Sequence, residues 1–216
     1  VAWRASVEGV APEQLEIVSV TGLDRPAHAD AWDRDFIAPS PNMPTYETAL
    51  VYPGACLLEG TNLSEGRGTT HPFEIFGAPW IDGARLAHDF HELNHAGVRL
   101  RPVTFRPTFH KHAGQTCGGV QVHVTNAQAF RPVATYLALL ALAHAQNKDL
   151  FQFRTEKYEF VDTIPALDLL TGDSEARAMI ATGAAPADIA LAIAGTGPYE
   201  AELVRAARAA GEACAT

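Results

Sequence analysis

Residues 117–146 read CGGVQVHVTNAQAFRPVATYLALLALAHAQ and contain both kinds of element from which the fold is built. In residues 119–125, three valines alternate with a glutamine and a histidine, and this period of two predicts a strand with one polar face. Residues 130–146 are mostly leucine and alanine, with a proline where the first helical turn would fall, which predicts a helix. This stretch therefore predicts a strand followed by a helix, and the other elements are predicted around this pair.

Outward from this stretch, strands and helices mix without strict alternation. We expect strands at 15–20 and 55–59, and an extended segment at 98–105 that is interrupted by Pro102. Helices are expected at 45–52 and from Asp82 to near Gly97, with a long irregular loop at 21–44. From Pro165 onward we expect an alanine-rich helical region with breaks at Gly172, Gly183, Pro186 and 195–198. The predicted fold class is α+β (mixed α/β), a mixed β-sheet flanked by helices with a helical C-terminal region.

Composition narrows the class of function. The 216 residues are 47% hydrophobic and carry a formal net charge of -9, which predicts a soluble globular protein. No cluster of Lys and Arg offers a surface to nucleic acid or to an anionic membrane, so neither is expected as a partner. Three cysteines form no disulfide framework. A single disulfide, such as one between Cys56 and Cys117, is still possible. The sequence therefore does not decide between a cytoplasmic and a secreted or periplasmic location.

The densest polar segment is residues 59–74, EGTNLSEGRGTTHPFE, directly after an apolar run. It holds three glutamates, one arginine, one asparagine and several hydroxyls. Loops that follow a rigid element often carry function. Glycoside hydrolysis uses two carboxyl groups, with other polar groups to hold sugar hydroxyls. A structural turn in which Arg67 pairs with a neighbouring glutamate is the open alternative.

Residues 91–95, HELNH, match the H-E-x-x-H pattern of zinc peptidases, in which two histidines one helical turn apart bind zinc. The predicted helix ends within two residues of His95, and no third ligand follows at the metzincin spacing. An exposed polar helix face explains the residues equally well. We therefore expect no metal and no cofactor, and a zinc peptidase is the least favoured alternative.

Two further polar segments are candidates for substrate contacts. In residues 109–119, Lys111 or His112 is placed to meet a substrate carboxylate, and a solvated loop is the alternative. Gln121 and His123 share one face of the predicted strand. These two residues belong either to a solvent-exposed face of the sheet or to part of a cleft.

Several segments closely resemble one family: PSPNMPT at 39–45, YPG at 52–54, LEGTNLSEGRGTT at 58–70, PFE at 72–74, GAPW at 77–80 and CGGVQVHVT at 117–125. They are similar to the DUF1343 family, whose characterised members are exo-β-N-acetylmuramidases of the NamZ type. These enzymes release N-acetylmuramic acid from the non-reducing ends of peptidoglycan fragments. The resemblance is most specific from Pro39 to about Leu140.

The resemblance implies a bacterial two-domain enzyme for peptidoglycan processing and cell wall recycling, with the cleft between a Rossmann-like N-terminal domain and a C-terminal domain. We expect residues 15–216 to be the C-terminal domain and 1–14 the remnant of an upstream segment. The family's Ser-Pro-Glu-His-Gly segment, which carries the usual candidate for the catalytic acid, is not found in these 216 residues. The implied partners are peptidoglycan-derived sugars, and either the missing N-terminal domain or further copies of the chain.

By matched position, the polar loop is expected to carry the site. Glu65 is predicted to be the carboxylate that reaches the substrate, with Arg67 as the cation for the lactyl carboxylate or for a glutamate. Glu59 and Asn62 are predicted to bind sugar hydroxyls. Further predicted substrate-binding residues are Asn42, Thr69, Thr70, Glu74, Lys111, His112, Gln121 and His123. His71 departs from the arginine that relatives commonly have. A non-catalytic glycan-binding or partner-docking module, left by truncation, is the main alternative function.

Overall fold

The structure, a computed structural model, describes residues 8–16, 18, 21–22 and 34–194. Two compact units are present, one formed by Val1–Ala31 with Thr196–Thr216 and the other by Trp32–Gly195. In the first unit the described residues include a short 3-10 helix, η1 (Pro12–Gln14). Three positions of the strand predicted at 15–20 lie outside the described residues, as does the break predicted at 195–198, so both stay predictions.

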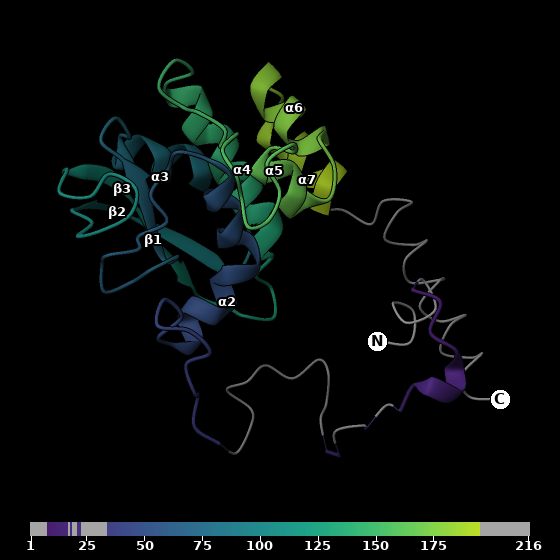
Figure 1. Cartoon of the computed structure of the whole chain (residues 1–216). Helices are drawn as coiled ribbons and strands as arrows, with labels where there is room; N and C mark the ends of the chain where they lie inside the picture. Colours follow the sequence, from purple (N-terminus) through teal and green to yellow (C-terminus); the bar gives the residue numbers. More distant parts are fainter. Residues whose placement is uncertain (1–7, 17, 19–20, 23–33, 195–216) are drawn as a thin grey trace. The chain divides into compact units, whose positions relative to one another are not determined.

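The second unit contains a three-stranded antiparallel sheet with the order β1-β3-β2 (Figure 1). Its strands are β1 (Ile75–Ala78), β2 (Val98–Phe105) and β3 (Cys117–Val124). β2 and β3 form a hairpin in register from Val98 opposite Val124 to Phe105 opposite Cys117. The α+β class is confirmed. The described sheet is antiparallel rather than mixed, because the loop after β2 returns the chain directly and requires no crossover helix.

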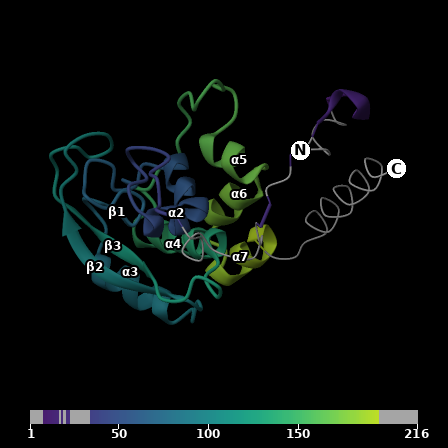
Figure 2. The same cartoon turned by 90° about the horizontal axis from the view of Figure 1, so that it is seen from below.

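Helices cover the sheet and extend away from it. They are α2 (Tyr46–Ala55), η3 (Cys56–Gly60), α3 (Gly83–His91), α4 (Pro132–Gln146), α5 (Ala166–Thr171), α6 (Glu175–Thr182) and α7 (Pro186–Ala194). α3 packs on β2 and β3, while α4 contacts α2, α3, α6 and α7. Figures 1 and 2 both show α4 between the sheet and the α5–α7 group. Among the described residues, no helix is both long enough and apolar enough to cross a membrane.

The core explains why α4 is apolar on nearly every side. Residues 135–141 of this helix are all buried, and its Tyr136 hydroxyl donates to the carbonyl of Phe73 at 2.8 Å. Tyr136 is fully enclosed, and burial, with the charge of Glu74, raises its pKa well above the ordinary value. A helix surrounded by other elements needs no polar stripe.

The predictions for α2, for residues 55–59 and for β2 were each partly wrong. α2 continues through Pro53 to Ala55, and residues 55–59 are helical rather than a strand, because a short apolar run does not distinguish the two. Gly54 lies so close to α4 that a Cβ there would be 2.8 Å from the Tyr136 ring, so close packing of α2 on α4 accompanies the longer helix. β2 runs unbroken through Pro102, because an edge strand tolerates a missing N–H donor.

The helix after Asp82 also ends earlier than predicted, at His91 rather than near Gly97. Asp82 caps it as expected, accepting from the Arg85 N–H at 3.0 Å. After the helix, Asn94 and Gly97 both have positive φ, which turns the chain into β2. The two cysteines in the described part, Cys56 and Cys117, are both free thiols, and burial raises the pKa of Cys56 to about 11.

Candidate functional site

The polar loop of residues 59–74 leaves η3 and is fastened to β1. Ser64 and Gly77 exchange two backbone hydrogen bonds, at 2.8 and 3.0 Å, which fix the middle of the loop beside the sheet. Gly66 and Gly68 then adopt φ values of 75° and 80°, turning the chain tightly. Both glycines are also required by space, because a Cβ on Gly68 would lie 2.7 Å from the Phe109 nitrogen. The turn therefore brings the loop against residues 108–112.

Glu65 lies at the centre of this contact and is completely enclosed, with 0% of its side chain exposed. Its Oε1 is 2.9 Å from Nδ1 of His110 and 3.0 Å from Nε of Arg67. Its Oε2 is 3.0 Å from Nζ of Lys111. A carboxylate buried among basic groups is stabilised by their charge, and a ligand approaching from solvent does not meet it in this conformation. The structure thus encloses the residue that was predicted to reach the substrate.

Lys111 is engaged by three groups. Besides its ion pair with Glu65, its ammonium donates to the carbonyls of Leu58 and Leu63, each at 3.0 Å. Burial lowers the pKa of Lys111, while the nearby Glu65 carboxylate opposes that shift. Lys111 therefore ties η3, the polar loop and its own loop together.

Arg67 forms the next layer of the cluster. Its Nη2 is 2.6 Å from Oε1 of Glu59, and its guanidinium lies 5.0 Å from the centre of the Phe73 ring. Oε2 of Glu59 accepts from the hydroxyl of Tyr158 at 2.7 Å. Burial, followed by the hydrogen bond and charge of Glu59, raises the pKa of Tyr158. Arg67 is thus occupied by protein carboxylates, which leaves it poorly placed to take the carboxylate of a sugar.

A pocket of about 400 Å³ opens beside this cluster. It is lined by Thr61, Asn62, His110, Lys111, His112, Gln152, Phe153, Arg154 and Glu156. Of the predicted substrate-binding residues, Asn62, Lys111 and His112 lie here. The lining residues of this pocket come from two loops and from a segment far along the chain.

That segment, residues 150–154, is held against the start of the polar loop like a short strand. Asn62 donates through its side chain to the Leu150 carbonyl at 2.8 Å and accepts from the Gln152 N–H at 3.0 Å. The Arg154 N–H donates to the Gly60 carbonyl at 2.8 Å. The amide of Asn62 is therefore used within the protein, whereas its neighbours on the adjoining segment face the pocket.

Residues 50–196 match the family model described as exo-beta-N-acetylmuramidase NamZ, C-terminal. This chain belongs to the NamZ C-terminal family.

The family assignment is supported by individual relatives. The chain is 41% identical over 169 residues to the peptidoglycan beta-N-acetylmuramidase NamZ of Bacillus subtilis, which covers 78% of this chain and 39% of that protein. The chain thus spans about two fifths of this relative's length. A crystal structure of a DUF1343 family protein from Bacteroides fragilis matches 53% of the chain and 30% of its own, with 28% identity and a TM-score of 0.51.

Other predicted site residues of this NamZ-type domain lie apart from the pocket. Glu74 is buried and accepts from the Thr48 hydroxyl at 2.7 Å. Gln121 is buried and accepts from Arg101 on the neighbouring strand, whereas His123 is exposed. The remaining three are Asn42, which is half-buried and donates its N–H to Ser40, Thr69, whose hydroxyl donates to the Gly66 carbonyl at 2.6 Å, and the exposed Thr70.

The sequence-based prediction missed most of the pocket residues, including His110 and Arg154, and it also missed Tyr158 of the cluster. His110 lies in the 109–119 segment, where the sequence analysis favours its neighbours Lys111 and His112. His110 and His112 both have positive φ, which is uncommon for residues other than glycine. Arg154 and Tyr158 lie in a segment with no local motif, and only contacts between distant parts of the chain identify them.

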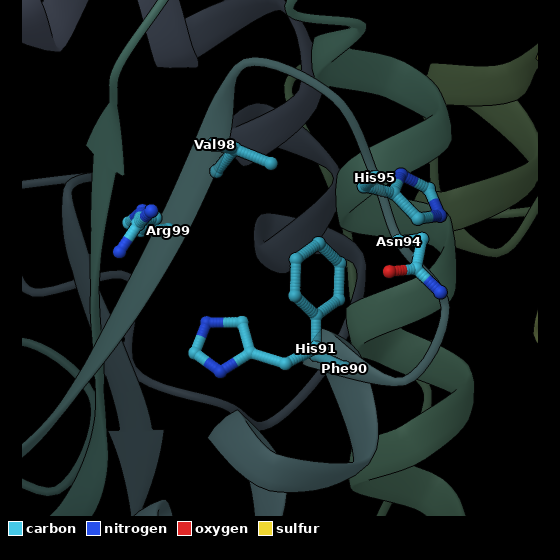
Figure 3. A pocket seen from close by; sticks show the side chains of 6 residues that line it. All are labelled: Phe90, His91, Asn94, His95, Val98 and Arg99. Atoms are coloured by element: carbon cyan, nitrogen blue, oxygen red, sulfur yellow. The ribbon is translucent and has the colours of Figure 1, made fainter.

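The HELNH segment does not form the arrangement that zinc peptidases use. α3 ends at His91, and Nε2 of that histidine accepts the Leu100 N–H at 3.2 Å. The His95 ring instead packs beside Phe90 with ring centres 5.0 Å apart, and burial lowers its pKa (Figure 3). Among the described residues, no group of three or more His, Cys, Asp or Glu is placed to hold a metal ion.

Proposed function

We propose that this chain forms one wall of a cleft that binds N-acetylmuramic-acid-containing glycans in a glycoside hydrolase of the NamZ type. The observation that carries the proposal is the convergence of the polar loop, the 110–112 loop and the 152–156 segment on one pocket. The NamZ relative is described as a peptidoglycan beta-N-acetylmuramidase, and the matched region includes all three segments. Sugar sites commonly combine hydrogen-bonding groups with an apolar surface, and Phe153 supplies such a surface here.

The pocket histidines offer defined hydrogen-bonding atoms. Nε2 of His112 lies 2.8 Å from the carbonyl of Asn62, so this nitrogen carries the proton and donates. In the neutral ring Nδ1 is then an acceptor for a sugar hydroxyl or acetamido N–H. The same reasoning gives His110, whose Nδ1 faces Glu65, a free Nε2. Glu65 is in this proposal a positioning residue that fixes His110 and Lys111.

Hydrolysis of a glycosidic bond requires groups that this side of the cleft does not supply. Glycosidases of either stereochemistry use carboxyl groups on both sides of the bond, roughly 5–10 Å apart. In this chain Glu59, Glu65 and Glu74 are all buried and engaged by neighbouring side chains. We propose that a second wall, with a catalytic acid, comes from an N-terminal domain or another copy of the chain.

The test is hydrolysis of 4-nitrophenyl N-acetylmuraminide by the 216-residue chain, alone and mixed with the N-terminal part of the Bacillus subtilis NamZ. We expect negligible release of nitrophenol by the chain alone and turnover by the mixture. The N-terminal part alone is the control. Robust hydrolysis by the 216 residues would contradict the proposal, because both carboxyl groups would then lie within this chain.

A non-catalytic glycan-binding module is the second candidate, and one observation favours it. All three loop carboxylates already have protein partners, so the polar loop in this conformation presents no carboxylate to a sugar. A chain that binds N-acetylmuramic acid, yet gives no turnover with any added N-terminal part, would establish this function in place of the first.

A further inference from the structure

We infer that Arg154 recognises the carboxylate of the lactyl group that distinguishes N-acetylmuramic acid from N-acetylglucosamine. This inference rests on the proposed function and assigns its sugar selectivity to one side chain. Arg154 lies in the pocket wall, and no sequence motif marks it. Whether Arg154 is available to a ligand carboxylate depends on which cations around the pocket already have an anionic partner.

The other cations near the pocket are neutralised within the protein. Lys111 is paired with Glu65 and also donates to two backbone carbonyls. Arg67 is paired with Glu59 and Glu65. Within the described part of the chain, no carboxylate forms an ion pair with Arg154. Its positive charge is also one of the influences that lower the pKa of Lys111.

Arg154 is held in place while most of its donors stay free. Its backbone is fixed on both sides, because its N–H donates to the Gly60 carbonyl at 2.8 Å and its carbonyl accepts the Ala166 N–H at 3.1 Å. Its guanidinium lies 5.2 Å from the centre of the Tyr158 ring, and Nη2 donates to the Lys157 carbonyl at 2.9 Å. A guanidinium has five N–H donors, so this one hydrogen bond leaves four for a ligand.

The chemistry of this arrangement fits a carboxylate. An arginine supported on an aromatic ring presents a planar fork that binds both oxygens of a carboxylate at once. Glu156 also lines the pocket and would repel an anion, but it is exposed, and solvent screens its charge. N-acetylglucosamine has a hydroxyl where muramic acid has the lactyl ether. The two sugars therefore differ only in the lactyl group, and the Arg154 variants isolate the contribution of its carboxylate.

The experiment is a titration of the 216-residue chain with each monosaccharide, followed by NMR chemical-shift changes. We expect N-acetylmuramic acid to bind at least about tenfold more tightly than N-acetylglucosamine, the size of a charge-assisted hydrogen bond. Arg154→Gln should reduce the affinity for N-acetylmuramic acid to that for N-acetylglucosamine and leave the latter unchanged. Arg154→Lys, which keeps the charge without the fork, should fall between them.

Arg131→Gln is the matched control, because Arg131 also donates only to carbonyls of its own segment, those of Gln128 and Phe130. It should retain the wild-type preference. Unchanged melting temperature for Arg154→Gln would show that the fold is intact. A preference for N-acetylmuramic acid that survives in Arg154→Gln, or equal wild-type binding of both sugars, would overturn the role of Arg154 while the proposed function stands. A wild-type chain that binds neither sugar would overturn both.

Discussion

The carboxylate of Glu65 lies 3.0 Å from the ammonium of Lys111, and the glutamate has no solvent exposure at all. The two residues belong to different loops, because Glu65 precedes β1 and Lys111 lies between β2 and β3. Their contact closes the polar loop over the 108–112 loop, and His110 joins it from the same side. The pair therefore builds the pocket wall by fixing the groups around it.

Glu65→Gln should destabilise the protein strongly. The substitution leaves the buried ammonium of Lys111 without its counter-charge, and breaking a buried ion pair costs about 3–5 kcal/mol. At about 2–4 °C for each kcal/mol in a chain of this size, the melting temperature should fall by about 6–20 °C. Differential scanning calorimetry measures it. The exposed Glu92→Gln is the control and should shift the transition by no more than about 2 °C. A similarly small shift for Glu65→Gln would show that this carboxylate is free for a ligand.

Gly68→Ala should separate the two loops. A Cβ at this position would lie 2.7 Å from the Phe109 nitrogen and 2.8 Å from the Thr108 nitrogen, both backbone atoms. Gly114→Ala is a matched control, because Gly114 has a similar φ of 75° but nothing within 4 Å of its Cβ position. Both variants introduce backbone strain of about 1–2 kcal/mol. Urea unfolding should show a further loss of about 1–3 kcal/mol for Gly68→Ala alone. Equal losses would mean that the loops are not in close contact.

Tyr158→Phe should change the response of stability to alkaline pH. The folded-state pKa of Tyr158 lies above its ordinary value of 10.0, so the folded protein retains this proton after the unfolded chain has lost it. The resulting stabilisation is complete below about pH 10 and is lost as the pH rises through the folded-state pKa. The free energy of unfolding should therefore fall more steeply between about pH 9 and about pH 11 in the wild type than in the variant. Other titrating groups cancel in this difference, so parallel curves would contradict the prediction.

Chelation should leave the protein unchanged. His91 already accepts a backbone N–H through Nε2, and His95 is turned toward Phe90, so the HELNH segment does not present two imidazoles to one ion. We expect substoichiometric zinc by elemental analysis and the same melting temperature with and without EDTA. Zinc near one ion per chain, with a melting temperature that EDTA lowers, would restore the zinc peptidase hypothesis.

Features that depend on neighbouring residues could be predicted from the amino-acid sequence. The caps at Thr45 and Asp82, the glycine stops at Gly172 and Gly183, and the apolar helix α4 lie where local chemistry predicts them. Capping and helix termination are interactions within one turn, so a short stretch of sequence contains all the groups involved. The motif around residues 58–70 likewise indicated the family before any contact was known.

Which groups of the polar loop are buried and charge-paired depends on the tertiary structure. Glu65 and Arg67 look available in the sequence, but Lys111, His110 and Tyr158 enclose or engage the loop from distant segments. Arg154 looks ordinary in the sequence and becomes the cation without an ion pair in the pocket wall. Burial and charge pairing depend on all atoms surrounding a group, and most of those atoms come from residues far away along the chain. For that reason the sequence could indicate a candidate segment, whereas the surroundings of each of its residues became known only from the fold.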